Sequence, residues 1–130
     1  MAFEYLRLVR TYKAGGNLTA KQFFLVKYQA SDDSVVAITA DTDVPFGVLQ
    51  NNPASGAAAE VMHNGISKMV ASAAITRGAP LGTASDGRGV TRVIGTDTTK
   101  YVCGVALETA SGAASVIAAL VNCMDPHRAA

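Results

Sequence analysis

The side chains with the most chemistry to offer are two histidines, His63 and His127, and two cysteines, Cys103 and Cys123. A cysteine hydrolase needs a thiol with a basic histidine in hydrogen-bond reach and a third group to orient it. His63 precedes Asn64-Gly65, so it is expected to be exposed at a hairpin, and His127 belongs to a C-terminal tail of the kind that is usually disordered. A cysteine hydrolase is therefore kept only as a minor alternative.

The same residues offer little to a metal ion or a cofactor. Asp125-x-His127 is the only ligand spacing present, and two cysteines twenty positions apart do not match a paired CxxC zinc site. They are expected to be free buried thiols, with a disulfide as the less favoured alternative. Asp86-Gly87-Arg88-Gly89 lacks the Lys-Ser/Thr of a phosphate loop. The sequence predicts a protein that binds rather than catalyses, without cofactor or metal.

The elements that position these residues follow from an apolar, weakly charged composition. The chain has 130 residues, of which 49% are hydrophobic, 16% charged and 6% aromatic, and its net charge is +1. Disordered chains are charge-rich and apolar-poor, and nucleic-acid modules carry a basic stripe or stacking aromatics, so both classes are disfavoured. The length fits one domain with its own core.

Charge is unevenly distributed along the chain. Residues 1–27 hold five basic residues against one acidic residue, which leaves the remainder at −3 because the whole is +1. A basic leading segment suggests docking on an acidic partner surface, although a solvated strand with ordinary cations explains it equally well. The charged first residues do not resemble a signal peptide and the longest apolar run is too short for a bilayer, so synthesis in a cytoplasm and no membrane contact are expected.

Turn residues recur about every ten positions with short apolar stretches between them, which is typical of an all-β sandwich or barrel. Asn64-Gly65 and Asp86-Gly87 are strong hairpin signals, and Asp32-Asp33 marks another turn. One helical turn is possible at 19–22, and 115–124 fits either a helix or a buried strand. Expected strands cover the ranges 24–28, 34–39, 46–50, 60–63, 66–70, 81–83, 90–93, 101–107 and 115–124.

An internal similarity favours a strand at 115–124. Phe46-Gly47-Val48-Leu49 and Cys103-Gly104-Val105-Ala106 are each followed by an Ala-Ser-Gly-Ala-Ala turn and then by an apolar segment. Since the first such segment reads as a strand, the second is expected to be one as well. Two strand–turn–strand units suggest pseudo-symmetric halves of one barrel rather than a solenoid, which needs three repeats or more.

The order and spacing of several motifs over about residues 17–121 resemble the small capsid decoration (cement) proteins of tailed bacteriophages, and are similar to lambdoid head decoration proteins. Residues 3–7 are not covered by the resemblance. The motifs are LTAKQF at 18–23 with Val26-Lys27, PFGVLQNNP at 45–53 with Ser55-Gly56, Val61 followed by GISK at 65–68, AITRGAPL at 74–81, DGR at 86–88 and GVA at 104–106.

The resemblance implies a small single-domain β-barrel or β-tulip on the outer surface of an expanded phage head. Such proteins usually form homotrimers at local threefold positions and clamp adjacent major capsid subunits against DNA pressure, with no cofactor, no reaction and no direct nucleic-acid contact. The expected partners are therefore the major capsid protein and further copies of this chain, and the expected place is the virion, after synthesis in the bacterial host cytoplasm. A tail or spike component is the alternative.

Residues 1–16 are expected to form an N-terminal arm or an edge strand beside a 17–130 β-barrel body. If they form the docking arm, apolar anchors should dominate binding, because exposed charge pairs contribute little. The expected capsid-binding residues are Phe3, Tyr5, Leu6, Arg7, Arg10 and Lys13.

Overall fold

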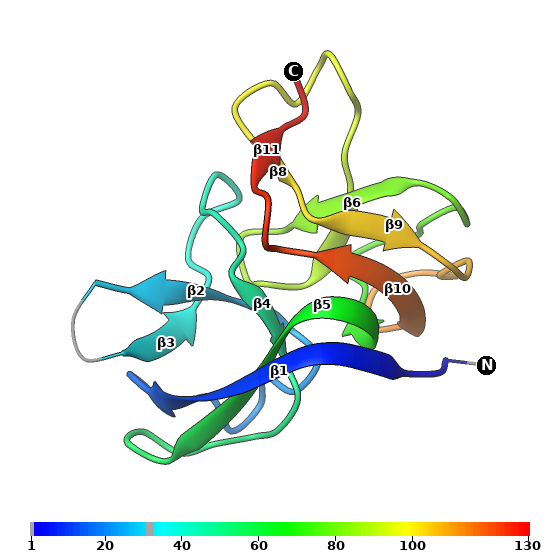
Figure 1. Cartoon of the computed structure of the whole chain (residues 1–130). Helices are drawn as coiled ribbons and strands as arrows, with labels where there is room; N and C mark the ends of the chain where they lie inside the picture. Colours follow the sequence, from blue (N-terminus) through cyan, green and yellow to red (C-terminus); the bar gives the residue numbers. More distant parts are fainter. Residues whose placement is uncertain (1, 31–32) are drawn as a thin grey trace.

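The computed structural model describes residues 2–30 and 33–130, which form eleven strands and no helix (Figure 1). The all-β prediction is confirmed. The strands are β1 (Tyr5–Ala14), β2 (Leu25–Gln29), β3 (Ser34–Ala37), β4 (Gly47–Leu49), β5 (Ala58–Val70), β6 (Pro80–Thr83), β7 (Gly89–Thr91), β8 (Tyr101–Val102), β9 (Gly104–Ala106), β10 (Val116–Asn122) and β11 (His127–Arg128).

The first five strands close into a small barrel. They follow the order β1-β3-β2-β4-β5, and pairing between β1 and β5 completes the ring. Closure leaves room for one layer of inward side chains, which form a compact apolar core. That core contains Tyr12, Ala14, Leu18, Val26, Val35, Leu49, Ala59 and Val61.

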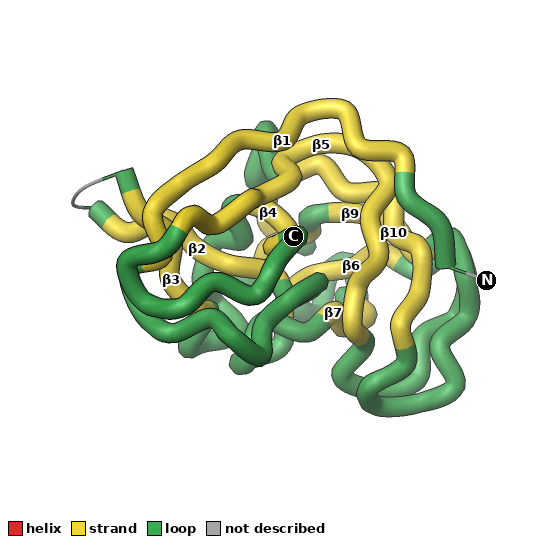
Figure 2. Tube along the Cα trace, turned by 90° about the horizontal axis from the view of Figure 1, so that it is seen from below, coloured by secondary structure: helices red, strands yellow, loops and turns green. Residues whose placement is uncertain are grey.

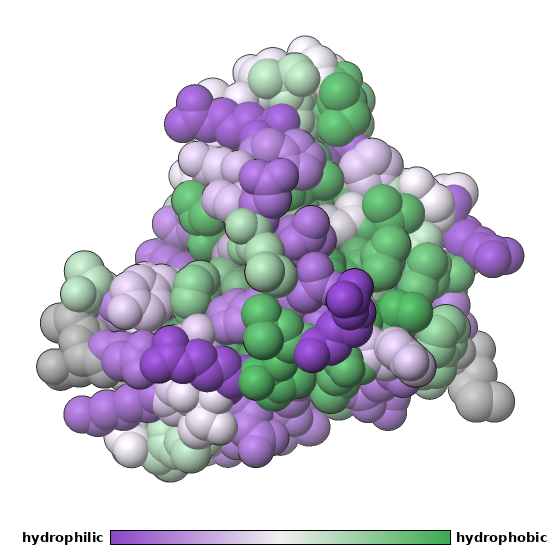
Figure 3. All heavy atoms as spheres, in the orientation of Figure 1, coloured by the Kyte–Doolittle hydropathy of each residue, from purple (hydrophilic) through white to green (hydrophobic). Residues whose placement is uncertain are grey.

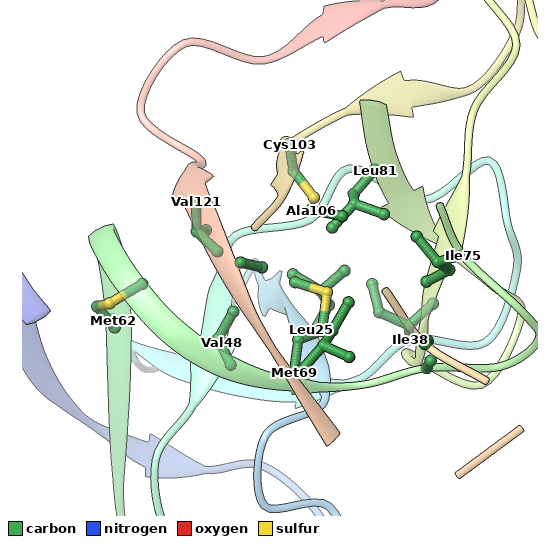
Figure 4. Close-up of a cluster of buried hydrophobic side chains, with 14 residues drawn as sticks. Leu25, Ile38, Val48, Met62, Met69, Ile75, Leu81, Cys103, Ala106 and Val121 are labelled. Atoms are coloured by element: carbon green, nitrogen blue, oxygen red, sulfur yellow. The ribbon is translucent and has the colours of Figure 1, made fainter. Parts of the chain in front are cut away.

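The strands β10, β9, β6 and β7 extend the sheet from the far end of β5. A second core lies between this extension and the outside of the barrel, and it includes Met69, Leu81 and Cys103 (Figure 4). Neighbouring residues of β2, β4 and β5 face different cores: Val48 belongs to the second core, whereas Leu49 belongs to the barrel core. β4 is therefore buried on both sides, and its sequence Gly-Val-Leu is wholly apolar.

The predicted hairpin at Asn64-Gly65 is wrong, because both residues lie inside the single long strand β5. Gly65 has φ +134, but Asn64 does not take the positive φ that a hairpin turn of this kind requires. The positive φ instead belongs to a bend in β5, and Figure 1 shows the strand curling at this end of the barrel. A Cβ at Gly65 would lie 2.6 Å from the carbonyl oxygen of Tyr5, so glycine also permits the close approach of β1.

Other local predictions hold, except that the possible helical turn at 19–22 is not formed. The Asp86-Gly87 turn joins β6 to β7, with Gly87 at φ +95. β2 and β3 form the antiparallel pair expected around the Asp32-Asp33 turn, with Asp33 at φ 51, although Asp32 itself lies outside the described residues, as do residues 1 and 31. Residues 116–122 form a strand, and 19–22 form turns without a helix.

The two strand–turn–strand units of the sequence repeat are the pairs β4–β5 and β9–β10, both antiparallel. They meet through the antiparallel β5–β10 pair, in the order β4-β5-β10-β9. The two glycines at equivalent places, Gly47 and Gly104, each pack against the backbone of the next strand in their unit, where a Cβ would lie 2.6 and 2.2 Å from a carbonyl oxygen. The repeat is therefore maintained by the same close backbone contact in both units.

The C-terminal tail is ordered, contrary to expectation. β11 pairs with β8, Ala129 is buried, and its amide donates to the carbonyl of Lys100. Its carbonyl accepts from Gly95, which fixes the projecting 93–97 loop. No helix of the described part is long and apolar enough to span a membrane.

Candidate functional site

The strand β1 is exposed over most of its length. From Tyr5 to Thr11 every residue is exposed, and only Tyr12 and Ala14 near its end enter the barrel core. Figure 2 shows β1 running along the outside of the molecule next to β5. A strand that makes contacts only within its own chain usually buries at least one face. Five large apolar side chains here are 41–71% exposed, namely Phe3, Tyr5, Leu6, Leu8 and Val9. We call residues 3–11 the β1 surface.

The outer edge of β1 is also open. β1 pairs with β5 from Tyr5 to Lys13, but it pairs with β3 only at Lys13 and Ala14. Among the described residues, the edge facing away from β5 therefore has no strand neighbour from Tyr5 to Tyr12. An open edge with apolar side chains is a template for another chain.

An apolar row continues from β1 across the sheet. Tyr5 lies opposite Ile66 of β5, Ile66 lies opposite Leu120 of β10, and Leu120 lies opposite Val105 of β9. Directly opposed residues share one face of a sheet, so these side chains form a row over four strands, about 14 Å across. We call Tyr5, Ile66, Leu120 and Val105 the apolar row. Figure 3 shows green side chains gathered where Figure 1 places β9, β10 and the start of β1.

Two bulges lie beside this row. Leu6 pairs with Gly65, Leu8 with Asn64 and Val9 with Met62, which leaves Arg7 as an extra residue in β1 and His63 as an extra residue in β5. Bulges bend a strand and redirect its side chains, and they are frequent at functional edges. Here they interrupt the β1–β5 pairing between Leu6 and Val9, within the exposed part of β1.

The cations of β1 differ in whether they form ion pairs within the chain. Arg10 donates to Asp33 at 2.8 Å and lies over the Tyr12 ring, 4.7 Å from its centroid. The hydrogen bond with Tyr12 and the charge of Asp33 raise the pKa of Arg10. By contrast, Arg7 and Lys13 form no ion pair within the described part of the chain. These two cations are available to an acidic partner.

A groove borders the β1 surface. A cavity of about 440 Å³ is lined by apolar residues that include Phe46, Pro126 and Met124, with His63 and Tyr12 at its wall. A second cavity of about 260 Å³ is lined by Arg7, Leu8, Asn64 and again Met124. The shared Met124 places the two cavities side by side next to β1.

The groove does not assemble a nucleophile and base. His63 is buried rather than exposed, which corrects the sequence expectation; its Nδ1 lies 2.8 Å from the carbonyl oxygen of Phe46 and its Nε2 lies 2.8 Å from the Tyr12 hydroxyl. Because a carbonyl only accepts, Nδ1 carries the proton and Nε2 accepts from Tyr12. A hydrogen bond with Cys103 and burial raise the pKa of Cys123, so its thiol stays protonated. This geometry gives the hydrolase alternative no support.

No group of three or more metal-ligating side chains occurs in the described ranges, and His127 lies exposed on β11. The residues predicted from the sequence for capsid binding, in contrast, share one strand and its lead-in: Tyr5, Leu6, Arg7, Arg10 and Lys13 are on β1, and Phe3 precedes it. Sequence reasoning missed the neighbouring residues Leu8, Val9, Ile66, Val105, Leu120 and Met124. The adjacent pair Leu8-Val9 was a visible signal, but the others needed the strand register.

Comparison with known proteins decides the family. The family model described as phage cement protein matches residues 6–122, which is most of the chain. The chain belongs to the phage cement protein family. It is therefore a structural protein of the phage capsid, and the resemblance seen in the sequence is confirmed.

Among solved structures, this cement protein is similar to the head fiber gp8.5 N base in bacteriophage phi29, with a TM-score of 0.67. The two are 23% identical, and the match covers 89% of this chain and 94% of that chain. At this identity the likeness shows a shared fold. No curated protein sequence matches this cement protein.

Proposed function

We propose that this cement protein binds the outer surface of an expanded phage head and clamps adjacent major capsid subunits, stabilising the shell against DNA pressure. The proposal rests on the exposure of β1. Both faces of this strand are exposed and one of its edges is open, so its apolar side chains remain in contact with water in the isolated protein. Contact with a capsid subunit covers that area.

Residues 1–16 act in this proposal as the docking segment of a 17–130 body. Phe3, Tyr5 and Leu6 supply apolar anchors. Arg7 and Lys13 meet capsid carboxylates, and Arg10 joins them by exchanging its partner Asp33. The segment is nonetheless integrated into the fold, because Tyr12 and Ala14 belong to the barrel core. Its role is therefore tested by point substitutions, since deletion removes a barrel strand.

Homotrimers at local threefold positions need a second surface on each copy. The part of the apolar row on β9 and β10, extended by the exposed Val116, supplies apolar area separate from the open edge of β1. In a cyclic trimer this surface meets a different patch of the next copy, so the contacts close a ring. Many such weak contacts over a shell add by multivalency.

The test is binding to purified expanded heads that lack this protein. Wild-type protein should bind and raise the temperature at which the heads lose DNA, and Tyr5→Ser should weaken binding. Ile94→Ser is the matched control, because Ile94 is 57% exposed on the 93–97 loop away from β1. Equal binding by both variants contradicts the assignment of β1.

Copy number distinguishes the proposal from its alternative, a tail or spike component. The measurement is the ratio of this protein to the major capsid protein in purified virions. A shell-covering cement protein gives a ratio approaching one to one, whereas a few copies per virion indicate a tail or vertex position and end the proposal.

A further inference from the structure

The two cysteines of the chain flank two paired strands, β9 and β10, at the second core. Cys103 separates β8 from β9, and Cys123 directly follows β10. Gly104 pairs with Val121, and the amide of Asn122 donates to the carbonyl of Cys103 at 2.8 Å. From strand spacing and rise, their α-carbons are on the order of 6 Å apart, inside the ~4.4–6.8 Å range that a disulfide spans.

Backbone hydrogen bonds and packing fix the positions of both cysteines. The amide of Cys123 donates to the carbonyl of His63 at 2.9 Å, which ties the residue to β5 as well as to β10. Cys103 is a member of the second core and Cys123 packs against it (Figure 4 shows Cys103). Both thiols are free, and interaction with the Cys103 thiol raises the pKa of Cys123.

The pair is accessible to a small reagent. Cys123 is half-buried and lines the 440 Å³ groove, while Cys103 is 3% exposed and lines a separate cavity of about 230 Å³ with Val105 and Leu120. Cys123 is therefore the thiol that an incoming molecule meets first. Cys103 is placed to react with whatever forms on Cys123.

We propose that Cys103 and Cys123 are a covalent modification site at which a small disulfide, such as oxidised glutathione, converts the thiol pair into an intramolecular disulfide. The Cys123 thiolate attacks one sulfur of the reagent, whose S–S bond breaks and releases one glutathione thiolate. The Cys103 thiolate then attacks Sγ of Cys123 and releases the second. Two protein thiols are oxidised, one glutathione disulfide is reduced to two thiols, and the protons of the protein thiols pass to the leaving thiolates.

The cross-link joins the start of β9 to the end of β10. It closes the loop that carries Leu120 and Val105 of the apolar row, and it fixes Cys123 beside Met124 in the groove wall. Closing a loop of this kind stabilises a protein mainly by restricting its unfolded chain. In a reducing compartment the pair stays open, and in an oxidising medium it closes. This inference stands independently of capsid binding.

The rate of closure depends on pH. The hydrogen bond with Cys103 and burial raise the pKa of Cys123, so the attacking thiolate is scarce at neutral pH. The reaction should be slow at neutral pH and accelerate as the pH rises, because exchange proceeds through the thiolate.

The experiment treats the native, fully reduced protein with oxidised glutathione at mildly alkaline pH. We expect both titratable thiols to be lost, the intact mass to fall by two hydrogen atoms without a retained glutathione, and digestion to release a Cys103–Cys123 linked peptide. The melting temperature should shift upward and return on reduction with dithiothreitol.

Two single variants control the order of events. Cys103→Ser should accumulate a stable glutathione adduct at Cys123, and Cys123→Ser should react slowly because Cys103 is buried. Cys103→Ala and Cys123→Ala replace any serine variant whose melting curve shows a folding defect. A stable adduct on the wild type, a disulfide-linked dimer, or reaction only in urea overturns the proposal.

Discussion

The Tyr12 hydroxyl donates to Nε2 of His63 across a distance of 2.8 Å, joining β1 to the bulge residue of β5. The Phe46 ring contacts both partners, with centroid distances of 5.4 Å to Tyr12 and 4.6 Å to His63. This buried cluster anchors one end of β1 in the barrel. The exposed half of the strand is therefore held in a fixed position rather than left as a loose arm.

Replacing Tyr12 by phenylalanine should destabilise the protein. Tyr12→Phe keeps the ring contacts but leaves Nε2 of buried His63 without its donor, which costs about 1–3 kcal/mol. Urea denaturation measures the change in the free energy of unfolding. Tyr28→Phe is the control, since Tyr28 is 48% exposed and also contacts Phe46. Similar effects of the two substitutions contradict the role given to the Tyr12–His63 bond.

Gly65 should tolerate no side chain. At φ +134, an alanine Cβ would lie 2.6 Å from the Tyr5 carbonyl oxygen and 2.8 Å from the Arg7 nitrogen, both of which are backbone atoms. Gly65→Ala should therefore cost roughly 1–3 kcal/mol or more and displace β1. Gly112→Ala meets nothing within 4 Å and should leave stability nearly unchanged. Thermal unfolding and amide exchange of β1 measure both; an unchanged β1 in Gly65→Ala contradicts the close approach.

The same glycine explains why part of the fold was not predictable from the sequence. Asn-Gly marks a place where the backbone takes a positive φ, and a bend within a strand needs that conformation as much as a hairpin turn does. Only the pairing partners distinguish them, and those partners, β1 and β10, lie far away in the sequence. His63 was misplaced for the same reason. The Asp86-Gly87 turn was predictable because its two strands pair locally.

The candidate site was likewise only partly predictable from the sequence. The residues of β1 were recognisable as apolar and basic in a continuous segment, and the structure places them on one strand. The remainder of the apolar row depends on the sheet order β9-β10-β5-β1, which sets Val105 and Leu120 in line with Tyr5. Strand order is a tertiary property, so no local pattern in the sequence contains it.

Asp43 should contribute to acid sensitivity. Burial alone would raise its pKa, but amides of Thr39 and Ala40 at 3.0 Å and the Lys27 ammonium at 2.9 Å outweigh burial and lower the pKa of this carboxyl. Its stabilisation is therefore present above the unfolded-state pKa of about 3.9 and is lost as the pH falls through the lower folded-state pKa.

The measurement is the free energy of unfolding from pH 7 down to pH 2. Asp43→Asn should be less stable than wild type at neutral pH and lose less stability on acidification. Glu60→Gln removes an exposed carboxylate that has no ion pair in the described ranges, and should change the profile little. Parallel acid profiles of Asp43→Asn and wild type are the result that rejects this role.

Substituting Arg7 tests how much charge, compared with apolar contact, contributes to the affinity for the capsid. It is exposed and without an ion pair in the described part, so its contact with a capsid carboxylate would be a surface pair contributing about 0–1 kcal/mol. Arg7→Gln should therefore weaken binding to expanded heads by no more than about fivefold at low salt, and the difference should shrink at high salt. Arg77→Gln removes the same charge from an exposed position outside β1 and should bind like wild type.

The apolar variant Tyr5→Ser should lose more affinity than Arg7→Gln at every salt concentration, because burying the Tyr5 ring does not depend on ionic strength. The opposite ranking, with a strong salt dependence of wild-type binding, means that docking is chiefly electrostatic and that the exposed apolar residues of β1 face another copy of the chain.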